Sequence, residues 1–138
     1  MPSLHLQSIT AGTDCAVLRI GGEIDAYSAP QLREQVIKLL GDGTRHIVID
    51  LRGVEFLDST GLGALVGSLK RVREQDGSLA LVATAGKILT VFRVTGLIRV
   101  FEFHPSAAEA ISSDPDWQTA MAAAGQSAEE WCRAHELQ

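Results

Sequence analysis

The 138-residue chain lacks the material for disulfide staples, a metal centre or a membrane span. Its two cysteines, Cys15 and Cys132, lie far apart, with no C-x-x-C spacing and no neighbouring histidine. Neither a disulfide framework nor a metal site is therefore expected, and both thiols are predicted to be reduced and structural. No apolar run approaches the roughly 18 residues of a membrane span, and the N-terminus lacks the layout of a signal peptide. We expect a cytoplasmic protein without a membrane partner.

Basic charge is also scarce. The formal net charge is -5, and the excess of acid falls in the tail: residues 1–112 carry 11 Lys or Arg against 12 Asp or Glu, whereas residues 113–138 carry one against five. The only basic cluster, "LKRVR" at 69–73, fits the exposed face of a helix. Binding to nucleic acid is therefore not expected.

What the chain does have is apolar material for a core, at 46% hydrophobic residues. Residues 3–10 and 14–22 alternate partly in polarity, which predicts a β-hairpin. A capping box of Ser28 and Gln31 then predicts the start of an amphipathic helix that ends at Gly41. The chain thus opens with two antiparallel strands and a helix.

The middle of the chain alternates strands with helices. "HIVIDL" at 46–51 is continuously apolar, as in a strand covered on both faces, and is predicted to be the centre of the sheet. Residues 59–75 place apolar side chains at helical spacing and predict a second helix. Four shorter elements follow: a buried strand at 78–83, a helix at 86–96, an edge strand at 99–103 and a helix at 105–111. This alternation predicts an α/β fold with a mixed sheet flanked by helices.

The composition changes after Ile111, which predicts a domain at 1–112 followed by a short, helical, acidic extension at 113–138. Asp114 before Pro115 is a predicted helix cap, and Ser127 with Glu130 forms a second capping box. Both tryptophans of the chain lie in this extension, either packed back on the domain or facing a partner or second subunit. A chain truncated after Ile111 is expected to remain folded.

The stretch "DSTGLG" at 58–63 is the candidate functional motif. A nucleophile elbow would need glycine two residues before Ser59, where Leu57 stands, and a P-loop would need a lysine. The histidines mark no base for Ser59 and are predicted to be structural: His5, His46, His104 and His135. No catalytic residue and no cofactor is therefore predicted, and the protein is not expected to be an enzyme.

Two roles for the motif remain open. Asp58 or Ser59 is predicted to cap the helix, which explains the polar residues alone. Gly61, Gly63 and Gly67 weaken a helix, which capping does not explain. Gly63 or Ala64, with Gly67 and Ser68, forms a stripe of small residues that is predicted to let another backbone approach closely, from this chain or from a partner. An exposed hydroxyl at a helix N-terminus also suits phosphorylation, because the positive end of the helix dipole tolerates the added charge.

Three stretches resemble the anti-sigma factor antagonists of bacteria, single-domain members of the STAS family. They are "GGEIDAYSAPQLRE" at 21–34, "VIDLRGVEFLDSTGLGALVGSLKRVRE" at 48–74 and "FRVTGLIRVF" at 92–101. The resemblance covers about residues 4–112 and is closest to the actinobacterial type. It implies the STAS fold, a mixed sheet of four or five strands flanked by helices.

The resemblance also implies a mechanism of partner switching. The unphosphorylated antagonist would bind an anti-sigma factor that is a serine kinase of the GHKL type, phosphorylation would end binding, and a PP2C-type phosphatase would reverse it. The motif assigns phosphorylation to Ser59. The implied partner-binding surface comprises Asp25, Asp58, Ser59, Thr60, Gly61 and Gly63. A homodimer is possible, and the alternative is a STAS scaffold or nucleotide-binding sensor without phosphorylation control.

Overall fold

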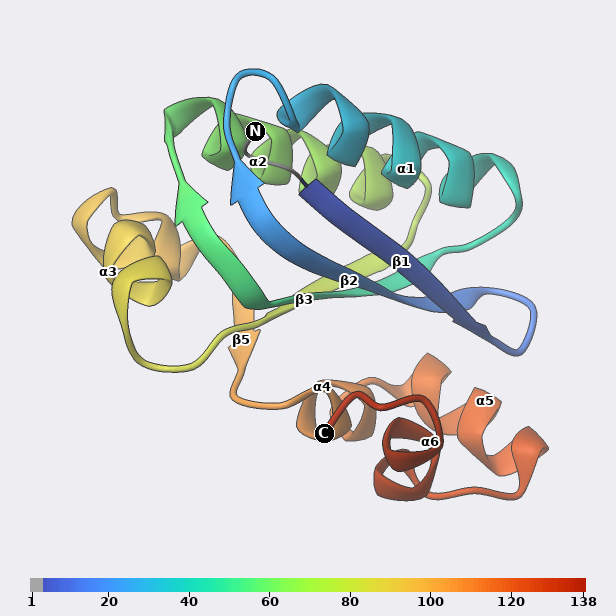
Figure 1. Cartoon of the computed structure of the whole chain (residues 1–138). Helices are drawn as coiled ribbons and strands as arrows, with labels where there is room; N and C mark the ends of the chain where they lie inside the picture. Colours follow the sequence, from blue (N-terminus) through green and yellow to red (C-terminus); the bar gives the residue numbers. More distant parts are fainter. Residues whose placement is uncertain (1–3) are drawn as a thin grey trace.

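The fold is built on a five-stranded mixed sheet in the order β1-β2-β3-β4-β5 (Figure 1). The computed structural model describes residues 4–138, so residue 3 of the predicted first strand lies outside it. The strands are β1 (Leu4–Ala11), β2 (Cys15–Ile24), β3 (His46–Leu57), β4 (Ser78–Val82) and β5 (Glu102–His104). β1 and β2 form the predicted antiparallel hairpin, and β2 to β5 run parallel. The prediction of β3 as the central strand is confirmed.

Helices cover both faces of the sheet, so the molecule has three layers. The helices are α1 (Ala29–Gly41), α2 (Ser59–Glu74), α3 (Lys87–Val94), α4 (Ala107–Ser112), α5 (Pro115–Ala124) and α6 (Ala128–Ala134). α1 and α2 lie on one face, and α4, α5 and α6 lie on the other (Figure 1). The predicted α/β class with flanking helices and a helical C-terminal extension is confirmed.

The pleat of β3 explains why its sequence is apolar without alternation. Ile47 and Ile49 belong to the first core, beneath α1 and α2, whereas Val48 points into the second core with Val17 and Val82. Successive side chains of a strand face opposite sides, so the stretch from Ile47 to Ile49, which is covered on both faces, is apolar at each position. Two cores therefore share one sheet.

The extension completes the second core. Trp117 of α5 and Trp131 of α6 are buried there, with ring centroids 5.5 Å apart in an edge-to-face arrangement. The interpretation that the tryptophans pack back on the domain is confirmed. The end of the chain is held as well, because Arg52 Nη2 of β3 donates to the Leu137 carbonyl at 2.7 Å. The division at 112/113 stays a prediction, since the core spans it.

Two local predictions need correction. Ser28 lies at the start of α1 but forms no capping box with Gln31, because its hydroxyl donates to the Glu23 carbonyl at 2.7 Å and accepts from the Asp25 amide. The last strand is shorter than 99–103: residues Leu97–Arg99 form a 3-10 turn instead. Leu97 and Ile98 pack against the first core from this turn.

The other caps follow the sequence. Asp114 caps α5 by accepting from the amides of Asp116 and Trp117, with Pro115 in the first turn. Ser127 and Glu130 form the predicted reciprocal capping box at the start of α6.

Candidate functional site

The candidate site lies at the edge of the sheet where β2 and β3 end. Ile24 and Leu57, the last residues of these parallel strands, are register partners, and the Asp58 amide donates to the Ile24 carbonyl at 3.3 Å. The loops after parallel strands meet at the carboxyl edge of a sheet, where open α/β folds bind their ligands. Asp25 and Asp58, which follow these strands directly, are thereby brought to one edge.

Asp58 caps α2 and presents the two hydroxyls that follow it. Its Oδ1 accepts from the Gly61 amide at 2.9 Å, and its backbone is extended, as usual for a capping residue. Ser59 and Thr60 occupy the first turn and are exposed, and their hydroxyls form no hydrogen bond with another residue within 4–138. The Ser59 hydroxyl therefore stands free at the N-terminus of a 16-residue helix.

Asp25 is held as a carboxylate by the turn that leads into α1. Its Oδ1 accepts from the amides of Tyr27 at 2.9 Å and Ser28 at 3.0 Å. These bonds, that of Ser28 foremost, lower the pKa of Asp25 below its ordinary value. The edge thus carries a fixed negative charge next to the helix N-terminus of Ser59.

The glycines of the motif have different surroundings. A Cβ on Gly61 would lie 2.6 Å from the Ile24 carbonyl oxygen and 2.6 Å from Leu57 Cδ1. Gly61 is therefore buried where α2 meets β2. It lets the start of α2 lie close to the end of β2, and it does not face the solvent. Gly63 and Gly67 have nothing within 4 Å of a built Cβ, so they leave open space on the exposed side of α2.

Two exposed aromatic residues flank the motif and were missed by the sequence reasoning. Tyr27 is 92% exposed, and Phe56, which pairs with Glu23 across β2 and β3, is 46% exposed. The signal is present in the sequence: a tyrosine two residues after Asp25, and a phenylalanine one residue before the end of β3. Large apolar groups beside fixed charges are typical of protein-binding surfaces.

A shallow cavity of about 410 Å³ lies beside this edge, lined by residues at the ends of β3 and β4 and the start of α3. Its cationic residues are Arg52 and Lys87. Arg52 is already engaged: its guanidinium binds both oxygens of buried Asp50, at 3.0 and 2.8 Å. Little positive charge remains there for a phosphate group.

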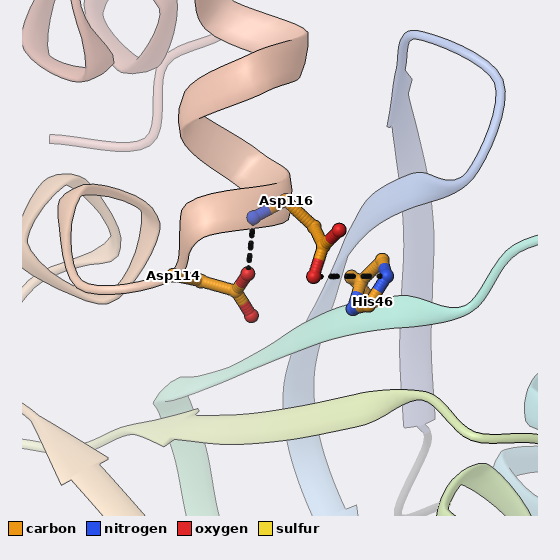
Figure 2. Close-up of side chains that lie close together, drawn as sticks. All are labelled: His46, Asp114 and Asp116. Carbon is orange, nitrogen blue, oxygen red and sulfur yellow. Dashed lines mark hydrogen bonds and ion pairs between the residues drawn. The ribbon is translucent and has the colours of Figure 1, made fainter.

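The opposite edge of the sheet holds a histidine–carboxylate cluster that the sequence did not predict. Ligand atoms of His46, Asp114 and Asp116 lie within 4.8 Å of one another (Figure 2). The residues come from β3 and from the start of α5, so no sequence spacing links them. This group is the one set of side chains within 4–138 that could hold a metal ion.

Within the described residues 4–138, no helix combines the length and apolarity required to traverse a bilayer.

Comparisons with known proteins agree with this architecture. The STAS-domain family matches residues 8–110. The chain is 40% identical over 80 residues to an anti-sigma-B factor antagonist of Staphylococcus aureus, covering 58% of this chain and 74% of that protein.

Solved structures show the same fold. The crystal structure of an anti-sigma factor antagonist from Mycobacterium paratuberculosis superposes with a TM-score of 0.72 at 28% identity, covering 80% of this chain and 93% of that one. The unphosphorylated antagonist SpoIIAA superposes with a TM-score of 0.68 at 22% identity, covering 79% and 95%. Residues 111–138, including α5 and α6, lie beyond the family match.

Proposed function

Because the chain belongs to the STAS family of anti-sigma factor antagonists, we propose that it acts by partner switching controlled at Ser59. In this mechanism the unphosphorylated protein binds an anti-sigma factor of the GHKL serine-kinase type, which releases the sigma factor. Phosphorylation of Ser59 by that kinase ends the interaction, and a PP2C-type phosphatase restores it. Antagonists of this family are regulators and not enzymes, and the proposal assigns no reaction to the chain itself.

The observation that carries the proposal is the free, exposed hydroxyl of Ser59 in the first turn of α2. A kinase can reach it without unfolding the helix. The first-turn amides and the positive end of the helix dipole stabilise an added phosphate, so the fold survives the modification.

The charges around Ser59 explain how a phosphate would end binding. We assign the partner-binding surface to Asp25, Asp58, Ser59, Thr60 and Gly63, with Gly61 buried beneath it, and we add Tyr27 and Phe56 as exposed apolar contacts. A phosphate adds about -1.5 to -2 charges next to two carboxylates. A partner that tolerates a neutral hydroxyl there meets a strongly negative patch after modification, and mismatched charge costs several kcal/mol at an interface.

Labelling with the cognate kinase and ATP tests the assignment. The wild type is expected to incorporate one phosphate and Ser59→Ala none, whereas Thr60→Ala, the matched control one residue along the helix, is labelled like the wild type. Equal labelling of Ser59→Ala and the wild type would overturn the role of Ser59.

The switch itself is tested by binding. The phosphoprotein is expected to bind the anti-sigma factor about 100-fold more weakly than the unmodified protein, for the charge mismatch given above. Its circular dichroism and melting temperature are expected to stay near those of the unmodified protein. Unchanged affinity would show that phosphorylation is not the switch.

Finer features of the family remain proposals for this chain. We place the protein in the cytoplasm, where kinase and phosphatase act, and we retain a homodimer as a possible state. The actinobacterial type is supported by "AYSAPQLRE" and "FLDSTGLGALVG" and by the mycobacterial structure at 28% identity, although the staphylococcal relative is 40% identical.

The alternative function is a scaffold or a nucleotide-binding sensor, in which Ser59 is only part of a helix start. The observation that favours it is the 410 Å³ cavity beside β3 and β4. The engagement of Arg52 with Asp50 argues against phosphate binding there. Isothermal titration with purine nucleotides separates the two functions: we expect no heat of binding, and saturable binding lost in Lys87→Ala would favour the sensor.

A further inference from the structure

A second polar centre lies at the amino edge of the sheet, at the opposite end of β3 from Ser59. His46 begins β3, Ser78 begins β4, and Asp114 and Asp116 begin α5. His46 is only 8% exposed, and its ring lies between the sheet and the first turn of α5 (Figure 2). The candidate functional site uses none of these side chains.

The hydrogen bonds of Ser78 fix the proton on the His46 ring. The Ser78 hydroxyl lies 2.6 Å from Asp114 Oδ2, and because a carboxylate only accepts, Ser78 donates its one proton there. Ser78 Oγ also lies 2.8 Å from His46 Nδ1, so the serine oxygen accepts and Nδ1 carries a proton. In the neutral ring, Nε2 is then left as an unprotonated lone pair.

That lone pair faces carboxylates. Nε2 lies 3.4 Å from Asp116 Oδ2 and 3.9 Å from Asp14 Oδ2, both longer than the roughly 2.7–3.2 Å of an N–H···O bond. Two ligand atoms about 2.0–2.1 Å from a tetrahedral zinc ion are separated by roughly 3.4 Å. The Nε2–Asp116 spacing therefore suits an ion placed between the two atoms better than a direct hydrogen bond.

The carboxylates around the His46 ring have no basic side chain as a partner in the part of the chain that the structure describes. Within the described residues 4–138, no Lys or Arg forms an ion pair with Asp14, Asp114 or Asp116. Arg45, next to His46, directs its guanidinium to the carbonyls of Leu40 and Thr44 instead.

The carboxylates of Asp14, Asp114 and Asp116 therefore lie around the His46 ring without a basic partner among the described residues 4–138.

We propose that His46, Asp114 and Asp116 bind a divalent cation of the zinc class. Nitrogen and carboxylate oxygen are both zinc ligands, and the Nδ1–Ser78 contact orients the imidazole as outer contacts do in known zinc sites. The ion bridges β3 of the STAS fold and α5 of the extension. It fastens the extension over the second core by joining segments that are distant in the sequence.

The test uses the full-length chain stripped of metal with a chelator. Isothermal titration with zinc chloride at pH 7.5 is expected to give one site per chain, and zinc is expected to raise the melting temperature. His46→Gln and Asp116→Asn each remove a ligand and are expected to bind zinc at least 10-fold more weakly. His135→Gln, which removes a histidine outside the cluster, is the matched control and is expected to bind like the wild type.

Two further measurements keep the test decisive. The Asp116 side chain is 59% exposed, so Asp116→Asn is expected to fold, which circular dichroism checks. Magnesium prefers oxygen ligands alone and is expected to bind far more weakly than zinc. Failure of the wild type to bind zinc, retention of full affinity in both variants, or equal affinity for magnesium would each overturn the proposal.

Discussion

At Gly61, the absence of a side chain decides how closely α2 approaches β2. A Cβ there would lie within 3 Å of the Ile24 carbonyl oxygen, so Gly61→Ala must push the helix start away from the strand. We expect this variant to lose about 1–3 kcal/mol in the free energy of unfolding, measured by urea denaturation. Ser59 would move with the helix, so weaker binding of the anti-sigma factor is also expected.

Gly63, two residues along the same helix, is the matched control. Nothing lies within 4 Å of its built Cβ, and alanine is the better helix former, so Gly63→Ala is expected to gain about 0.5–1 kcal/mol in stability. Loss of stability in both variants would contradict the assignment of Gly61 to the helix–strand contact.

Asp25 makes the stability of its turn dependent on pH. The amides of Ser28 and Tyr27 lower its pKa in the folded state, so its contribution is present above the unfolded-state pKa and is lost as pH falls through the folded-state value. We therefore expect the difference in unfolding free energy between wild type and Asp25→Asn to be constant from about pH 5 to 8 and to shrink below about pH 4. Urea denaturation across this range measures it, and a constant difference down to pH 3 would contradict the role of the turn.

At the scale of elements, local patterns predicted most of the fold. The continuous apolar run at 46–51 predicts the central strand, because a strand that is buried on both faces does not alternate in polarity. The helical spacing of Leu62, Leu65 and Leu69 predicts α2, because a helix that is buried on one face repeats its apolar residues every three to four positions. The caps at Asp114 and Ser127 were also predicted, since a cap needs only residues close in sequence.

The features that the sequence does not predict share a physical cause, which is contact between distant segments. Ser28 matches a capping box, but its hydroxyl donates to the Glu23 carbonyl instead. The close contact of Gly61 with Ile24 follows only from the pairing of β2 with β3. The cluster around His46 forms only because the extension folds back and brings Asp116 to the ring.

The extension is an element whose removal should disrupt the domain. Composition alone predicts that a chain ending at Ile111 stays folded, but Trp117 and Met121 of α5 and Trp131 of α6 belong to the second core together with residues of the sheet. We expect the truncated chain to expose this face, bind an apolar dye and lose its cooperative melt.

A full-length variant keeps this prediction testable if the truncated chain cannot be purified. Trp117→Ala empties a fully buried position and is expected to cost about 3–5 kcal/mol in the free energy of unfolding. Tyr27→Ala removes an aromatic side chain that is 92% exposed and is expected to change stability by less than about 0.5 kcal/mol. A truncated chain that melts like the full-length protein would contradict the shared core.

At the scale of the whole molecule, the sheet joins the two cores into one unit. Every residue of β3 from His46 to Leu51 is buried, and alternate side chains serve opposite cores. If the sheet came apart, the buried side chains of both cores would be exposed together. The Ser59 edge and the His46 edge therefore lie at the two ends of one rigid strand, and a ligand at either edge stabilises the same folded state.

Unfolding should accordingly be a single transition seen by two probes. Both tryptophans lie in the second core, so their fluorescence reports the α5–α6 side, whereas far-ultraviolet circular dichroism reports all helices, including α1 and α2. We expect the two signals to change at the same urea concentration, because a shared sheet prevents one layer from unfolding alone. An earlier fluorescence transition would show that the extension unfolds as a separate unit, in line with a domain boundary at 112/113. If added zinc then brought the fluorescence midpoint to the same urea concentration as the circular dichroism midpoint, the ion would be what couples the α5–α6 layer to the rest of the fold.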